Sequence, residues 1–220
     1  FVGTHVIQEL LNRGANIRTS IHKNPMKIQD DRIEILKNID LTKFDDVMKL
    51  VEGADYVINC SGNILHPSTV ATDYQVGLSH TIIMTNLLEA CYKSNVKRFQ
   101  DFNSSTDMHI GIARGTAVFG PYDNFNLETC HVIPALIKRI LVGEDPLVVW
   151  GSPNVVRDFL YIKDFAKGAL LVLENGESMR PYNVGYGSTI NIGQIVNTIL
   201  KVTGKTPKVE WDNSKPTTIP

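Results

Sequence analysis

Cysteine is scarce in this sequence, and its spacing excludes the sites that cysteines usually build. The chain has three cysteines among 220 residues, Cys60, Cys91 and Cys130, with no Cys-x-x-Cys spacing among them. Neither a disulfide framework nor a thiolate zinc site fits this distribution. We therefore expect no metal site, and a reduced, cytoplasmic compartment as the default.

Long hydrophobic runs and an excess of charge of one sign are also missing. No apolar stretch approaches the ~20 residues that a helix needs to cross a bilayer. The first residues, Phe1-Val2-Gly3, lack the basic charge that opens a signal peptide. Because 22 Lys and Arg residues balance 23 Asp and Glu residues, we expect neither nucleic acid nor a membrane as a partner.

What the sequence does contain is an alternation of short apolar runs with longer stretches of helical periodicity. The runs of strand length are 16–21, 33–36, 56–60, 98–102, 110–113 and 182–185, and the helical stretches are 2–13, 45–51, 81–93, 132–141, 164–174 and 192–203, with the segment 150–161 before 164–174. This alternation is typical of an α/β protein with a parallel sheet. The length suits one domain, or one and a half.

Two places lack a segment that such a sheet requires. The first helical stretch begins at Val2 with no strand before it, so we expect a truncated start. Between the strands at 98–102 and 110–113 there are too few residues for the helical crossover that joins parallel neighbours. Either these two strands form an antiparallel hairpin, or a segment is missing near Thr106-Asp107, which is the interpretation we favour.

Several segments resemble, in the same order along the chain, the extended short-chain dehydrogenases/reductases of the NAD-dependent epimerase/dehydratase family, which act on nucleotide sugars. They are Phe1-Val2-Gly3, Asp40-Leu41, Val96-Lys97-Arg98-Phe99 before Asn103-Ser104-Ser105-Thr106, Val118-Phe119-Gly120-Pro121, and the run from Val156 to Asp164. Within the family, Asp123-Asn124-Phe125 followed by His131-Val132-Ile133-Pro134-Ala135-Leu136 is most similar to the GDP-fucose synthase branch.

The resemblance implies a fold and a domain arrangement. The fold would be a Rossmann-like doubly wound parallel sheet with a smaller C-terminal α/β substrate-binding lobe. Residues 1–120 would form the NADP-binding domain and residues 121–220 the substrate-binding lobe, with 164–186 packing back on the first domain. The resemblance also implies a homodimer.

It further implies a nicotinamide cofactor and the residues that bind it. Gly3 would be the last glycine of the dinucleotide fingerprint, where the helix start faces the pyrophosphate. Arg18, His22 and Lys23, with no acid beside them, favour NADP over NAD, although His22 and Lys23 could also be solvated turn residues. The other expected contacts to the cofactor are Asp40, Leu41, Cys60, Ser61 and Gly62.

For catalysis the family uses a Ser or Thr together with a Tyr-x-x-x-Lys pair, in which the lysine lowers the tyrosine pKa. Ser105 matches the serine position, with Thr106 beside it. None of the seven tyrosines is followed four residues later by a lysine. In the family this pair lies on the crossover helix after the serine, where the residue count already falls short. If the natural chain lacks the segment, it would be a catalytically dead relative.

The substrate would be bound by residues of the second half. Arg157 matches the arginine that pairs with the substrate diphosphate, for which a guanidinium is well suited. His131 matches a histidine that works as an acid/base in epimerisation, or it could be a helix-start residue shaped by nucleotide contacts. Thr106 stands where that branch has a cysteine. The other substrate contacts would be Asn124, Val132 and Lys138, and for Asp158 and Asp164 we favour structural roles, Asp164 as a helix N-cap.

These observations predict an NAD(P)-dependent nucleotide-sugar epimerase/reductase that acts at C4 of the sugar. A nucleotide-sugar 4-epimerase or a 4,6-dehydratase is the alternative within the family. The dehydratase would need an Asp-Glu pair after the Ser/Thr, whereas this chain has Asp107-Met108 there. The non-enzymatic alternative is a catalytically dead relative that binds NADP.

Overall fold

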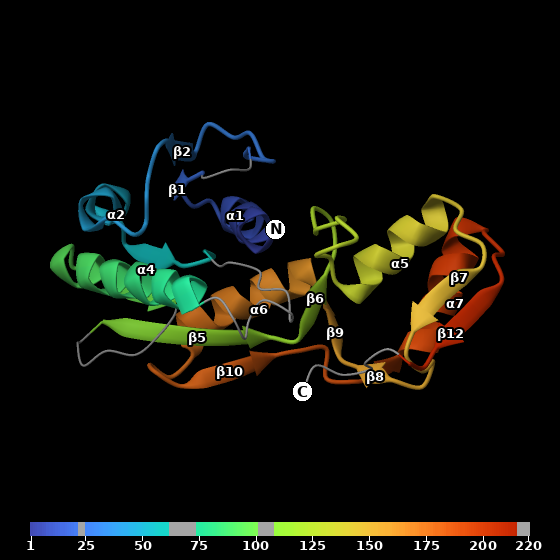
Figure 1. Ribbon diagram of the computed structural model, residues 1–220. Coiled ribbons are helices and arrows are strands. Elements are labelled where there is room, and N and C mark those ends of the chain that lie inside the picture. The colour runs from blue at the N-terminus through green and yellow to red at the C-terminus, as the bar shows by residue number, and fades with distance from the viewer. Residues whose placement is uncertain (22–24, 62–73, 101–107, 215–220) are drawn as a thin grey trace. The chain divides into compact units, whose positions relative to one another are not determined.

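The computed structural model describes residues 1–21, 25–61, 74–100 and 108–214 (Figure 1). The chain divides into two compact units. The unit that we call N-terminal comprises Val2–Arg114 and Lys163–Val184. The C-terminal unit comprises Phe1, Gly115–Ile162 and Gly185–Pro220.

The N-terminal unit is built on parallel strands. β3 (Tyr56–Ile58), β4 (Arg98–Gln100) and β5 (His109–Gly115) are parallel neighbours, and β10 (Pro181–Val184) flanks β5, so the order is β10-β5-β4-β3. β1 (Ile17–Ser20) and β2 (Ile33–Leu36) form a separate parallel pair. Such strands are joined by crossover connections that place helices over the sheet.

One face of the larger sheet is covered by α2 (Phe44–Val51) and α4 (Tyr74–Lys93). Phe99 of β4 and Ile110 of β5 are fully buried in one apolar cluster with residues of both helices. Cys91 of α4 lies in this cluster, where burial raises the pKa of its thiol to about 12. A thiol in that environment is a packing residue and not a nucleophile.

The opposite face is covered by α6 (Ile162–Asn175), and α6 in turn shares a cluster with α1 (Val2–Asn12) and Ile58 of β3. Successive side chains of a strand point to opposite faces, so Gly111 faces away from Ile110. A Cβ at Gly111 would lie 3.1 Å from Cα of Leu173, which shows how closely α6 approaches β5. Helices therefore cover both faces of a parallel sheet, and the predicted doubly wound fold is confirmed.

The pairing of β4 with β5 decides between the two interpretations of the short connection. Arg98 is opposite His109 and Gln100 is opposite Gly111 in a parallel register, so the antiparallel hairpin is wrong. The strands run in the same direction, although only residues 101–108 join them. A parallel pair with so few connecting residues has no room for the usual crossover helix.

The C-terminal unit has its own core between two helices and short strands. α5 (Val132–Leu141) and α7 (Ile192–Thr203) pack with the parallel pair β7 (Leu147–Trp150) and β12 (Val209–Asp212). β6 (Ala117–Phe119) pairs in parallel with β9 (Phe159–Tyr161), and β8 (Val156–Arg157) pairs antiparallel with β11 (Ile190–Asn191).

Local sequence signals explain the ends of α7. The side chain of Asn191 accepts a hydrogen bond from the backbone N–H of Gln194, and the Gln194 side chain accepts one from the Asn191 N–H. This reciprocal capping box fixes the start of the helix. At the other end Gly204 adopts φ of 67°, a left-handed conformation that glycine takes without a steric penalty.

In the described part of the chain, no helix combines the length and the apolar character that a membrane crossing requires.

Candidate functional site

In the N-terminal unit, the start of α1 lies against the end of β3. A Cβ added at Gly3 would be 3.5 Å from Cβ of Cys60, an ordinary van der Waals contact, so the first turn of α1 packs beside this strand end. The first N–H groups of a helix have no acceptor within the helix and favour an anionic ligand. Cys60 and Ser61 are both exposed here. The structure thus brings together three of the expected cofactor contacts, and Gly62 lies outside the described residues.

Asn59 shapes the backbone at this strand end. Its Oδ1 accepts hydrogen bonds from the Ser61 N–H at 2.9 Å and from the Ser61 hydroxyl at 2.6 Å. Its amide nitrogen contacts the sulfur of Met84 on α4 at 3.0 Å. Asn59 therefore orients Ser61, a role that the sequence reasoning did not consider.

Asp40 and Leu41 lie between β2 and α2. The Asp40 carboxylate accepts hydrogen bonds from the hydroxyl and the N–H of Thr42, at 2.6 Å and 3.0 Å, and these bonds hold the carboxyl pKa below its usual value. The carbonyl of Leu41 accepts a hydrogen bond from the Asn86 side chain of α4 at 3.0 Å. Asp40 therefore offers an exposed, ionised carboxylate on a backbone that is tied to α4.

Arg18 lies inside β1 and is already engaged. Its Nε donates to Glu34 of β2 at 2.7 Å, and its Nη1 donates to the carbonyl of Glu52. Glu34 is the register partner of Arg18, so this acid was missed because it lies on the neighbouring strand. His22 and Lys23, which follow β1, lie outside the described residues, as do Ser105 and Thr106.

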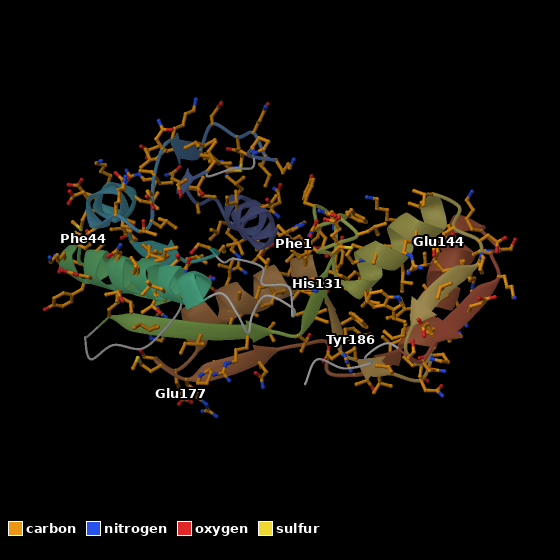
Figure 2. All side chains as sticks on the ribbon, in the orientation of Figure 1. Phe1, Phe44, His131, Glu144, Glu177 and Tyr186 are labelled. Atoms are coloured by element: carbon orange, nitrogen blue, oxygen red, sulfur yellow. The ribbon has the colours of Figure 1, made fainter. Side chains whose placement is uncertain are left out.

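In the C-terminal unit, His131 occupies the N-cap position of α5 (Figure 2). Its backbone is extended, with φ of −77° and ψ of 172°, and its side chain makes no capping hydrogen bond. The residue is exposed, and the next residue, Val132, is 37% exposed. The imidazole therefore does not cap the helix.

The loop before His131 is held by its own polar side chains. Asn124 accepts a hydrogen bond from the Asn126 N–H at 2.9 Å and donates to the Thr129 hydroxyl at 2.8 Å. Lys138 of α5 donates to the carbonyl of Phe125 at 2.9 Å. Asn124 and Lys138, both expected to contact substrate, thus both stabilise the loop that leads to His131.

Arg157 ends β8, and its Nη1 donates to the carbonyl of Val156 at 2.9 Å. Asp158 beside it accepts hydrogen bonds from the Thr116 hydroxyl and from the backbone N–H groups of Tyr186 and Gly187, between β10 and β11, which agrees with the predicted structural role. The predicted N-cap role of Asp164 is wrong. α6 begins at Ile162, which places Asp164 within the first helical turn, where an acid still interacts favourably with the helix dipole.

The model of the NAD dependent epimerase/dehydratase family matches residues 1–107 and residues 99–185 of the chain. The two matched stretches overlap at residues 99–107, which include the end of β4 and most of the short connection to β5 described above.

Among proteins of known function, the GDP-L-fucose synthase of Escherichia coli (strain K12) is 33% identical over 153 residues, which are 63% of this chain and 48% of that protein. The probable GDP-L-fucose synthase 1 of Oryza sativa subsp. japonica is 35% identical over 108 residues, 47% of this chain and 33% of that protein. The GDP-L-colitose synthase of Yersinia pseudotuberculosis is 26% identical over 219 residues, covering 92% of this chain and 68% of that protein. The chain thus spans between a third and a half of the two synthases, 33% and 48% of their lengths.

Solved structures show the same fold at lower sequence identity. The UDP-N-acetylglucosamine 4-epimerase from Methanobrevibacter ruminantium M1, in complex with UDP-N-acetylmuramic acid, superposes with a TM-score of 0.85 at 21% identity, covering 99% of this chain and 84% of that one. The UDP-glucose 4-epimerase of Thermus thermophilus in complex with NAD gives a TM-score of 0.77 at 18% identity, covering 98% and 85%.

Proposed function

The chain belongs to the NAD dependent epimerase/dehydratase family, and we propose that it is an NADP-dependent nucleotide-sugar epimerase/reductase that acts at C4 of the sugar. The observation that carries this proposal is His131, which is exposed at the start of α5 and makes no capping bond. The surrounding segment resembles GDP-fucose synthases, and two such synthases are among the relatives of the chain.

We assign the two ligands to the two units. The N-terminal unit would hold the cofactor, because a helix start, a strand end and the Asp40 carboxylate suit a dinucleotide there. Gly3, Cys60 and Ser61 would line the pyrophosphate, and Asp40 with Leu41 would flank the adenine. When bound, the nicotinamide cofactor supplies the hydride for the sugar ketone. The C-terminal unit would hold the nucleotide sugar.

The chain's own residues would then bind the substrate and move protons. Arg157 would pair with the diphosphate through its guanidinium. His131 would remove and return a proton at a carbon next to the ketone, since an imidazole exchanges protons near neutral pH. Ser105 would hydrogen-bond the sugar oxygen.

Cofactor choice gives a separate prediction. We expect NADPH to bind at least about tenfold more tightly than NADH, because a charge-assisted contact to the 2′-phosphate contributes ~1.5–3 kcal/mol. Since Arg18 is engaged by Glu34, we attribute this preference mainly to His22 and Lys23. Fluorescence titration of both cofactors tests it, with the double variant His22→Ala/Lys23→Ala beside Lys37→Ala, a lysine that follows β2, as the control. Equal affinities in the unmodified protein would refute the preference.

A second candidate function is favoured by one observation. No tyrosine in the chain is followed four residues later by a lysine, and the β4–β5 connection is too short to supply the helix that carries that pair in the family. On this basis the chain would bind NADP and a nucleotide sugar without converting it.

Product analysis separates the two candidates. We would incubate the full chain with NADPH and a panel of GDP-, UDP- and dTDP-linked 4-keto sugars, and identify products by mass. If the chain is an epimerase/reductase, we expect NADPH to be consumed and the sugar product to have gained one hydride and one proton. If the chain only binds its ligands, we expect the sugars to be recovered unchanged, although calorimetry detects binding of both NADPH and the nucleotide sugar.

A further inference from the structure

The carboxylate of Asp158 ties together stretches of the C-terminal unit that are far apart in the sequence. Its Oδ1 accepts hydrogen bonds from the backbone N–H of Tyr186 at 2.9 Å and from the Thr116 hydroxyl at 3.2 Å, and its Oδ2 accepts one from the Gly187 N–H at 3.0 Å. We call Thr116, Asp158, Tyr186 and Gly187 the Asp158 clasp. The bonds from Tyr186 and Gly187 hold the pKa of the Asp158 carboxyl below its usual value, so the clasp stays ionised at neutral pH.

The clasp directly follows the strand segment that ends in Arg157. β8 pairs antiparallel with β11, and Arg157 lies opposite Ile190. The loop that Asp158 binds through Tyr186 and Gly187 leads directly into β11, so the carboxylate fixes the partner strand of Arg157. On the other side the backbone of Asp158 accepts a hydrogen bond from the Ala117 N–H at 3.2 Å, at the start of β6.

The packing around the clasp leaves little freedom. A Cβ added at Gly185 would lie 2.8 Å from Oδ2 of Asp158 and 2.8 Å from Cγ2 of Thr116, distances too short for a side chain. Tyr186 is nevertheless 71% exposed, so the loop is held by its backbone and not by burial of the tyrosine side chain. We therefore expect this segment to be ordered before a ligand binds.

We propose that Asp158 is a positioning residue for nucleoside diphosphate binding, which it promotes by fixing the backbone that carries Arg157. A guanidinium on a fixed backbone loses less conformational entropy when it binds a diphosphate than one on a mobile segment. The inference rests on the proposed diphosphate role of Arg157, and it adds a residue that acts only through that arginine.

A double-mutant cycle tests it. Binding of GDP and of UDP would be measured by calorimetry for the unmodified chain, Arg157→Ala, Asp158→Asn and the double variant. We expect Arg157→Ala to weaken binding about thirtyfold and Asp158→Asn about tenfold. Because Asp158 acts through Arg157, the double variant should bind no more weakly than Arg157→Ala alone.

Two further variants keep the test decisive. Thr116→Val removes a single clasp bond at nearly constant volume, and it should weaken binding in the same direction even if Asp158→Asn folds poorly. Asp145→Asn is the control, since Asp145 also accepts a backbone N–H from a distant segment, that of Lys208 at 3.0 Å, and should leave affinity unchanged.

The outcomes distinguish this inference from the proposed function. The positioning role would be overturned if the loss of nucleoside diphosphate affinity in the double variant equalled the product of the two single losses, or if the Thr116→Val protein kept full affinity. Either result would leave Arg157 as a diphosphate ligand. Unchanged affinity in Arg157→Ala would overturn the diphosphate role and the inference together.

Discussion

We expect His131→Asn to abolish the incorporation of solvent deuterium into the sugar ring, while reduction of a ketone that is already epimerised continues at close to its normal rate. Only removal of a proton next to the ketone needs the imidazole, so the two reactions should separate. Incubation of the variant in deuterated water with GDP-4-keto-6-deoxymannose, followed by mass analysis of the recovered sugar, measures the exchange directly.

The position of His131 allows this substitution to be made without loss of folding stability. The imidazole makes no capping bond to α5, and asparagine is among the preferred N-cap residues, so the variant should melt at the same temperature or slightly higher. Loss of exchange with an unchanged melting temperature therefore reports chemistry and not folding. Deuterium exchange that persists in the variant would assign His131 to nucleotide contact only.

The second large effect is expected at Arg157. We expect Arg157→Ala to weaken nucleoside diphosphate binding by ~2 kcal/mol or more, roughly thirtyfold, because a diphosphate loses its charge-assisted pair. NADPH affinity should not change, since we assign the cofactor to the N-terminal unit. Calorimetry with GDP, UDP and NADPH on the same protein preparations measures the three affinities.

A structural arginine of the same unit provides the matched control. Arg139 of α5 is bonded to the Glu144 carboxylate and to the carbonyl of Val148. Arg139→Ala should therefore lower the melting temperature without a selective loss of nucleotide affinity. If Arg157→Ala behaves in the same way, Arg157 is a structural residue and the diphosphate must be bound elsewhere.

The longer elements could be predicted from sequence because their patterns are local. The apolar period of 132–141 and 192–203 predicted α5 and α7 with the bounds that the structure has. α4 begins at Tyr74, earlier than the expected 81, because the apolar period was recognised only in the second part of the helix. The segment 150–161 was treated as one stretch, but Gly151 and Pro153 interrupt it, and the structure divides it among β7, β8 and β9.

The contacts that were missed depend on pairing between distant segments. The strands β6, β11 and β12 were not predicted, because they are defined by pairing with β9, β8 and β7, which lie in distant parts of the sequence. The Arg18–Glu34 pair follows from the register of β1 with β2, and the Asp158 clasp follows from the approach of Tyr186 and Gly187 to β8. The glycines at 185 and 187 were the available signal for a close backbone approach there.

If this chain transfers a hydride to C4 of a nucleotide-linked sugar, transfer of an isotope from the cofactor tests that reaction most directly. The full chain would be incubated with GDP-4-keto-6-deoxymannose and NADPH deuterated at the transferred position, and the sugar analysed by mass spectrometry and NMR. We predict a reduced sugar with the deuterium at C4. Recovery of the unlabelled ketone, under conditions in which calorimetry shows both ligands bound, would contradict the enzyme and identify a binding protein.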